Sequence, residues 1–137
     1  MGRTMPGCHP AAISASLVFA ALIAPPASAY AADAAAPSAL ESGARYGQAL
    51  GVLEICYGSK LSGKAKALEA SYTGADQDKF KAQAAKIFEM WQKVKACTNQ
   101  RDPNQCKIIM DKSCLAAENE IGQAGTVMPG LVEFIKH

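Results

Sequence analysis

The strongest hydrophobic pattern in the chain lies between residues 73 and 121, where two amphipathic segments flank a short polar turn. In the first segment, from Asp76 to about Cys97, apolar side chains recur at every third or fourth position. At 100° per residue they form one stripe, which predicts a helix with a single buried face. Thr73 and Asp76 have the spacing of a capping box at its start. The stripe consists of Phe80, Ala84, Ile87, Phe88, Trp91 and Val94.

The second segment has a clear helix start. Asp102 precedes Pro103, so the carboxylate can cap the helix while proline occupies the first position, where a missing N–H costs nothing. Gly122 and Gly125 end the pattern. Apolar residues cover so much of this helix that we expect several neighbours to pack around it. One face holds Cys106, Met110, Cys114, Ala117 and Ile121, with Ile108 and Leu115 on the opposite side. We predict that the folded domain is built around this helical hairpin.

Shorter elements are predicted on both sides of the hairpin. Ser38 and Glu41 form a further capping box, and a helix follows from about Ala39 to Tyr57. Its apolar stripe consists of Tyr46, Leu50, Leu53 and Tyr57. A short helix is expected from about Lys64 to Tyr72, and a last one from Pro129 to Lys136. Because no run alternates with the period of a strand, the prediction is an all-α bundle of four to five helices.

Three glycines, Gly43, Gly47 and Gly51, recur every fourth residue within the first predicted helix. A glycine inside a helix costs about 1 kcal/mol relative to alanine, so three on one face predict the close approach of a neighbouring backbone. A membrane G-x-x-x-G pair is disfavoured because charged and amide side chains interrupt the segment. A self-association face, which would make the protein a homo-oligomer, is the alternative.

Residues 58–65 nearly match the phosphate-binding pattern G-x-x-x-x-G-K-[ST]. The match fails because Ala65 lacks the hydroxyl that binds magnesium, and because a helix is predicted where a strand should precede the loop. A Gly/Ser turn is therefore expected here.

Residues 1–29 have the organisation of a secretory signal peptide. Arg3 precedes an apolar run from Ala11 to Ala24, and Ala27-Ser28-Ala29 forms an A-x-A cleavage signature. The apolar run is shorter than the roughly 20 residues of a spanning helix, so no membrane span is expected after cleavage. An uncleaved anchor is the alternative interpretation.

The expected mature chain has a flexible leader at residues 30–37 and a single helical domain at 38–137. Cleavage after Ala29 leaves thirteen basic and twelve acidic residues, and this near-neutral balance gives no reason to expect nucleic-acid binding. The stretch 60–95 holds eight lysines against four acids. We interpret it as a solvated helix face, with an anionic partner surface as the alternative. The predicted location is the periplasm or the secreted space.

Four cysteines remain after cleavage, and in a short exported chain they predict two disulfides. Cys106 and Cys114 would lie about 12 Å apart on a continuous helix, beyond the roughly 7 Å that a disulfide spans. The spacing therefore favours Cys97–Cys106 together with Cys56–Cys114. The alternative is Cys56–Cys97 with Cys106–Cys114. The gaps are too wide for a zinc site, and no C-x-x-C motif supports thiol exchange.

Little catalytic chemistry remains in this sequence. His137 is the single histidine after Ala29, which removes Ser-His-Asp and Cys-His mechanisms unless the tail is recruited. We therefore assign no catalytic, cofactor-binding or metal-ligating residue. A carboxylate pair is the remaining catalytic option, with Glu54, Glu89, Asp111, Glu118 and Glu120 as candidates.

Four aromatic residues could line an apolar ligand cleft, although core packing is the stronger explanation for them. They are Trp91, Phe88, Tyr57 and Tyr72. The sequence as a whole favours a non-enzymatic binding or protein-interaction module, whose partner is another envelope or secreted protein. A carrier of an apolar small molecule or lipid is the alternative, and a carboxylate-dependent enzyme is the second.

Overall fold

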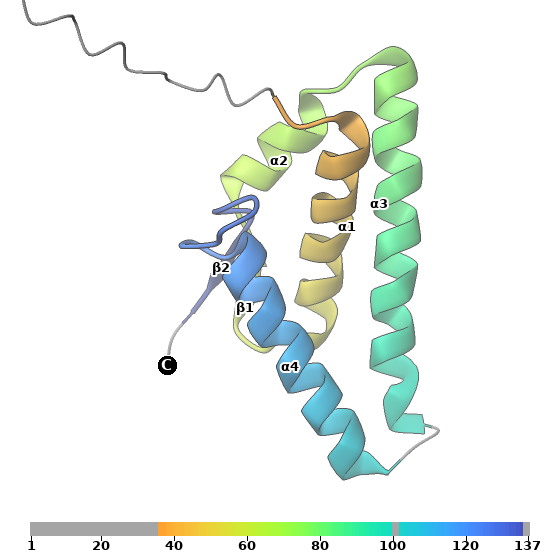
Figure 1. Ribbon diagram of the computed structural model, residues 1–137, viewed down its shortest axis with the longest axis vertical. Coiled ribbons are helices and arrows are strands. Elements are labelled where there is room, and N and C mark those ends of the chain that lie inside the picture. Colours follow the sequence, from red (N-terminus) through yellow and green to blue (C-terminus); the bar gives the residue numbers. More distant parts are fainter. Residues whose placement is uncertain (1–35, 100–101, 136–137) are drawn as a thin grey trace, which may run out of the picture. The chain divides into compact units, whose positions relative to one another are not determined.

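The computed structural model describes residues 36–99 and 102–135, so the predicted signal peptide 1–29 and most of the leader 30–37 lie outside the described residues. The described chain is mostly helical, as predicted, and adds a small two-stranded sheet that the sequence pattern did not predict (Figure 1). The elements in order are α1 (Ala39–Ile55), β1 (Ser59–Leu61), α2 (Gly63–Ala70), α3 (Gly74–Lys95), a 3₁₀ helix (Ala96–Asn99), α4 (Pro103–Ile121) and β2 (Val132–Phe134).

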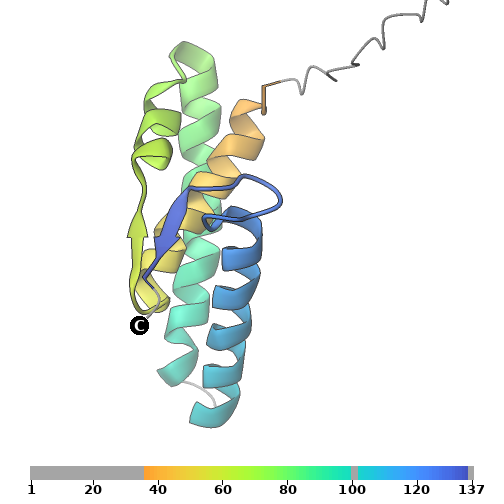
Figure 2. The same ribbon diagram turned by 90° about the vertical axis from the view of Figure 1, so that its left-hand side faces the viewer.

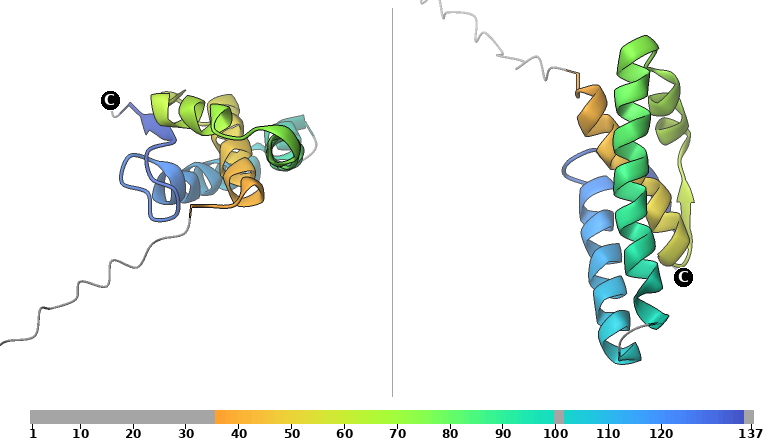
Figure 3. Two further views of the ribbon diagram at one scale, coloured as in Figure 1. Left: turned by 90° about the horizontal axis from the view of Figure 1, so that it is seen from above. Right: turned by 90° about the vertical axis from the view of Figure 1, so that its right-hand side faces the viewer.

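Helix α1 is the central element of this domain. It contacts α2, α3, α4 and β1, whereas α3 and α4 contact each other much less than α3 contacts α1. Seen from above, α1 lies between α3 and α4 (Figure 3). The prediction that the α3–α4 hairpin organises the domain is therefore wrong. Its two helices exist at the expected positions, but each packs on α1.

The glycines of α1 explain this arrangement. Gly43, Gly47 and Gly51 are all buried, and they lie against α3. A Cβ added at Gly43 or Gly47 would collide with the backbone carbonyl oxygen of Phe80 or Ala84, respectively, and at Gly51 with the tryptophan of α3. The predicted close-packing face is therefore present. Since α3 covers it, the face is not available for self-association.

Small residues, rather than the large apolar ones, form the interior face of α1. Tyr46 is buried as predicted, but Leu53 is 38% exposed and Tyr57 is 91% exposed. The predicted stripe is wrong at these two positions because Ala49 and Val52, with the glycines, make the buried contact. The expectation that several neighbours pack around α4 is confirmed, because it contacts α1, α3 and β2, but these neighbours leave its outer side open. Its outward side chains Ile108 and Leu115 are 53% and 59% exposed.

Helix starts agree better with the sequence. The Ser38 hydroxyl accepts a hydrogen bond from the Glu41 N–H at 3.2 Å, and the Asp102 carboxylate accepts one from the Asn104 N–H at 2.9 Å. Thr73 occupies the N-cap of α3 but makes no side-chain capping bond there. The capping box predicted at that position is therefore not formed.

Two segments that were not predicted as strands form the sheet, so both predictions for them are wrong. Ser59–Leu61 pairs antiparallel with Val132–Phe134, where a plain turn and a last helix were expected (Figure 2). The Pro129-Gly130 turn, with Gly130 at a φ of 80°, redirects the chain along β1. As a strand, this short segment pairs its backbone with β1 while Leu131 and Val132 become fully buried.

An aromatic cluster joins α1, α3 and the segment that follows α2. Tyr72 stacks on Phe80 with ring centroids 5.2 Å apart, and Tyr46 lies 5.3 Å from Phe80 in a tilted arrangement. The Tyr46 hydroxyl donates to the Glu69 carboxylate at 2.6 Å. Burial, and then this neighbouring carboxylate, raise the pKa of Tyr46 to about 12.

We expect this tyrosine to make the fold sensitive to alkali. Between pH 10 and about 12, Tyr46 ionises in the unfolded chain but stays protonated in the fold, so the free energy of unfolding falls as pH rises. The stabilisation is fully present below pH 10. Urea unfolding at pH 9 and pH 11 should show a larger loss for the natural protein than for Tyr46→Phe. Equal losses in the two proteins would contradict this account.

Candidate functional site

The four cysteines form two disulfides, Cys56–Cys114 and Cys97–Cys106, with Cα–Cα distances of 5.6 and 5.7 Å. This is the pairing that the helical spacing favours, and it is incompatible with the alternative. Two disulfides are compatible with an oxidising extracellular compartment. They also fix α4 at two points, once against the end of α1 and once against the end of α3.

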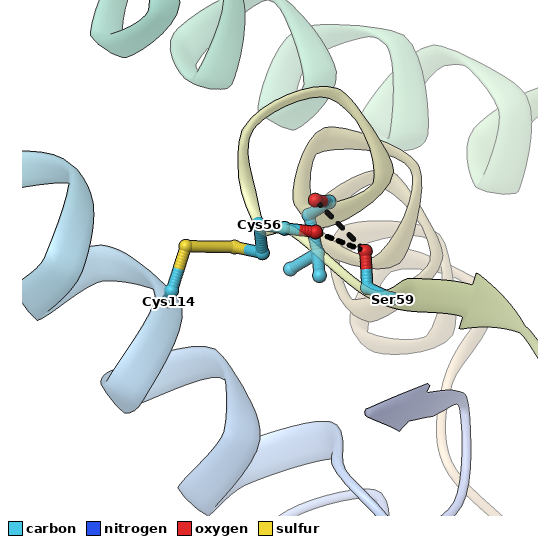
Figure 4. Close-up of a disulfide and its surroundings, with 4 residues drawn as sticks. Cys56, Ser59 and Cys114 are labelled. Carbon is cyan, nitrogen blue, oxygen red and sulfur yellow. Dashed lines mark hydrogen bonds between the residues drawn. A yellow bond between two sulfur atoms is a disulfide. The ribbon is translucent and has the colours of Figure 1, made fainter. Parts of the chain in front are cut away.

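Local hydrogen bonds hold Cys56 in position at the end of α1. Its N–H donates to the Val52 carbonyl at 2.8 Å. Its own carbonyl accepts from the Ser59 hydroxyl at 2.7 Å, as Figure 4 shows. Gly58, with a φ of 74°, allows the chain to turn between Cys56 and Ser59. The sulfur of Cys56 is therefore presented to Cys114 by a turn that is bonded on both sides.

A groove of about 490 Å³ lies beside the Cys56–Cys114 disulfide and is open to solvent. We call it the disulfide groove. The end of α1, one side of α4 and strand β2 form its walls. Two of its lining side chains are largely exposed, Tyr57 at 91% and Leu115 at 59%. Further lining residues are Met110, Phe134, Lys107, Asp111 and Glu118.

Two of the three charged side chains that line the groove pair with each other, and the third does not. Lys107 and Asp111 form an ion pair at 2.5 Å, one turn apart on α4. The Glu118 carboxylate is half-buried and makes no hydrogen bond or ion pair with any residue of 36–99 or 102–135. The groove therefore combines an apolar lining with one carboxylate that is available to a partner.

A second, smaller hollow of about 300 Å³ lies beside Trp91. At its edge, the Glu120 carboxylate accepts hydrogen bonds from Arg45 at 2.7 Å and from Gln48 at 2.8 Å. The side chains of Arg45, Gln48 and Glu120 are thus bonded to one another. The remaining lining residues are Met90, Val94, Ser113 and Ala116.

The four aromatic residues proposed for a ligand cleft do not converge on one cavity. Tyr57 lines the disulfide groove, and Trp91 lines the smaller hollow. Tyr72 packs on Phe80 in the aromatic cluster, with its hydroxyl 2.7 Å from that of Ser42. Phe88 lies half-buried on α3. The structure thus divides the set between core packing and two separate surface hollows.

The candidate carboxylates are mostly occupied by basic partners. They pair as Glu54 with Lys95 (2.6 Å), Glu89 with Lys93 (3.4 Å), Asp111 with Lys107 (2.5 Å) and Glu120 with Arg45 (2.7 Å). The hydrogen bond from Lys95 lowers the pKa of Glu54 below its usual value. Asp111 and Glu118 both line the groove, but they are seven positions apart on α4, which places their backbones about 10 Å apart along the helix axis. This arrangement gives no support to paired-carboxylate catalysis.

Further observations on the described residues concern charge, metals and membranes. Four of the eight lysines in 60–95 form ion pairs, which agrees with a solvated helix face. No group of three or more His, Cys, Asp or Glu in 36–99 or 102–135 could hold a metal ion. Within those ranges, no helix combines the length and apolarity needed to cross a membrane.

Sequence reasoning missed Phe134 as a wall of the groove. The signal was available, because Pro129-Gly130 is a turn dipeptide and residues 131–135 are rich in β-branched and aromatic side chains.

Comparison with models of known protein families, with curated proteins and with solved structures gave no match.

Proposed function

We propose that the protein is a non-catalytic binding module that contacts another envelope or secreted protein through the disulfide groove. The observation that carries the proposal is the exposure of Tyr57 and Leu115 around a floor fixed by a disulfide. Exposed apolar side chains that gather at a concave surface are typical of protein-interaction sites. The covalent link between α1 and α4 preorganises this surface, which reduces the cost of ordering it on binding.

The proposed setting is the periplasm or the secreted space. It is supported by the predicted signal peptide at 1–29 and by two disulfides that suit an oxidising compartment. The Cys56–Cys114 bridge then has a structural role, in which it holds the groove, and the thiols are not reactants.

The carrier hypothesis is favoured by one observation, the hollow beside Trp91. It is the weaker candidate because this hollow is small and open, while a carrier encloses most of its ligand. Tryptophan fluorescence titrated with a fatty acid tests it. A saturable shift would favour the carrier over the interaction module.

We expect Leu115→Asp to abolish binding of the partner without unfolding the protein. Leu115 is 59% exposed, so a surface substitution there should change the free energy of unfolding by no more than about 0.5 kcal/mol. A charge in the apolar lining would need to be desolvated on binding, which is unfavourable. A photoreactive benzophenone amino acid in place of Leu115, irradiated in the cells that export the protein, should yield one adduct of defined mass.

Leu40 provides the matched control, because it is an exposed leucine (52%) at the start of α1 and does not line the groove. The same photoreactive group in place of Leu40 should give no adduct, and Leu40→Asp should keep the partner. Identical adducts from both positions, or none from position 115, would overturn the proposed function.

A further inference from the structure

One edge of β2 carries main-chain groups that no strand pairs. Two backbone hydrogen bonds fix the antiparallel ladder, one at each end. The Ile135 N–H donates to the Gly58 carbonyl at 2.8 Å, and the Ser62 N–H donates to the Leu131 carbonyl at 3.0 Å. In such a ladder, alternate residues direct their N–H and C=O away from the neighbouring strand. Phe134, which is paired in register with Ser59, is one of these residues. Its backbone groups therefore face the outer edge of the sheet.

The side chain of Gln123 occupies this edge. Its amide oxygen accepts from the Phe134 N–H at 3.3 Å, and its amide nitrogen donates to the Phe134 carbonyl at 3.4 Å. A glutamine amide has the same donor and acceptor as a peptide group, so it replaces one residue of a missing strand. Both bonds are longer than the usual 2.7–3.2 Å, and both are exposed. A peptide backbone could displace them at small cost.

The space beside this edge continues into the disulfide groove. A hollow of about 430 Å³ is lined by Gln123 and Ala124 and shares Glu118 and Phe134 with the groove. Val132, two residue pairs further along the strand, is fully buried. Among the described residues, the open part of the edge is therefore at Phe134, beside the C-terminal end of α4.

A group that binds beside this edge must also complement the charge of Glu118. Glu118 stands where the two hollows meet, and its carboxylate has no partner among the described residues. A half-buried carboxylate is stabilised by a cationic hydrogen-bond donor, and covering it without one would be costly.

We infer that the partner contributes an extended peptide segment, which adds as a strand to the outer edge of β2 at Phe134. This segment displaces the Gln123 amide, places a basic side chain against Glu118, and inserts an apolar side chain between Tyr57 and Leu115. The inference rests on the proposed function and deepens it by naming the chemistry of the partner. Strand addition supplies affinity through main-chain bonds and specificity through alternate side chains.

The test uses a phage-displayed library of random nonapeptides, selected against the oxidised full-length protein. A selected peptide is then synthesised with one backbone nitrogen methylated at a time. Since Phe134 is the open residue of the described edge, methylation should weaken binding at least tenfold at the one position whose N–H meets the Phe134 carbonyl, and much less at the positions beside it. Hydrogen exchange at the Phe134 amide should slow when the peptide binds.

Two substitutions separate the contacts. Glu118→Gln should weaken peptides that carry a basic residue about tenfold, whereas Glu89→Gln on the exposed face of α3 should not. Gln123→Ala should leave affinity unchanged or raise it, because it removes only a competing amide.

Equal effects of methylation at neighbouring positions, no protection of Phe134, or a marked loss of affinity in Gln123→Ala would overturn the inference. If no peptide is selected while the photoreactive group at position 115 still captures a protein, strand addition is wrong and the interaction module stands. If neither experiment gives binding, both proposals are wrong.

Discussion

Replacing Cys56 and Cys114 together by alanine is expected to lower the free energy of unfolding by about 4 kcal/mol. The bridge joins residues 58 apart in the chain, and a loop of that length loses about 4 kcal/mol of entropy in the unfolded state under the chain-entropy model. The Cys97–Cys106 bridge spans only nine residues, for which the same relation gives about 2.5 kcal/mol. The two bridges should therefore differ by about 1.5 kcal/mol.

Equilibrium unfolding in guanidinium chloride measures both double variants against the natural protein, and Cys97→Ala with Cys106→Ala is the matched control. Small domains have only about 5–15 kcal/mol in total, so loss of the long bridge should shift the midpoint strongly. The same variant should lose the adduct at position 115, because α4 is no longer tied to the end of α1. If the short bridge contributes as much as the long one, unfolded-state entropy is not the main source of the stabilisation.

The features that the sequence predicted are those set by local or one-dimensional rules. The start of α4 follows from Asp102 and Pro103, whose effects act within one turn. The disulfide pairing follows from distance along a helix axis, which excludes Cys106 with Cys114 whatever the remaining fold is. Neither prediction needs to know which helix packs on which.

The features that were missed depend on contacts between distant segments. The stripe assigned to α1 gave weight to large side chains, but Gly47 and Ala49 make the tighter contact because they let α3 approach. Strand β2 has a partner, Ser59–Leu61, that lies more than 70 residues earlier in the chain. Local pattern alone does not identify such a partner, since strand preference is set largely by the neighbouring strand and by burial.

The disulfide groove belongs to this second class. Tyr57, Leu115 and Phe134 come from three parts of the chain, and their predicted roles differed. Tyr57 was assigned to a helix stripe or a ligand cleft, Leu115 to the second face of the hairpin helix, and Phe134 to a terminal helix. Together they became a functional signal only when the fold showed that they gather beside one disulfide. In this chain the two exposed apolar residues of the proposed site, Tyr57 and Leu115, are positions at which the hydrophobic pattern favoured burial.

Gly47→Ala is expected to destabilise the protein by about 2 kcal/mol, although alanine is the better helix former. Within a helix the substitution would ordinarily stabilise by about 1 kcal/mol. Here the added Cβ would collide with the backbone carbonyl oxygen of Ala84, which cannot rotate away as a side chain can. Helices α1 and α3 must separate, and overpacking of this kind costs about 1–3 kcal/mol beyond the gain in helix propensity. Urea unfolding monitored by circular dichroism measures the change.

Gly63→Ala is the control, since Gly63 is the first residue of α2 and an added Cβ there meets no atom within 4 Å. It should cause no loss and a gain of up to about 1 kcal/mol. The opposite signs distinguish a packing requirement from a general effect of glycine on the unfolded chain. If both variants are stabilised, the close contact between α1 and α3 relaxes at little cost, and α1 is not held at the centre of the domain by its glycines. If Gly47→Ala alone is destabilised, the glycine face is what allows α3 to pack closely on α1.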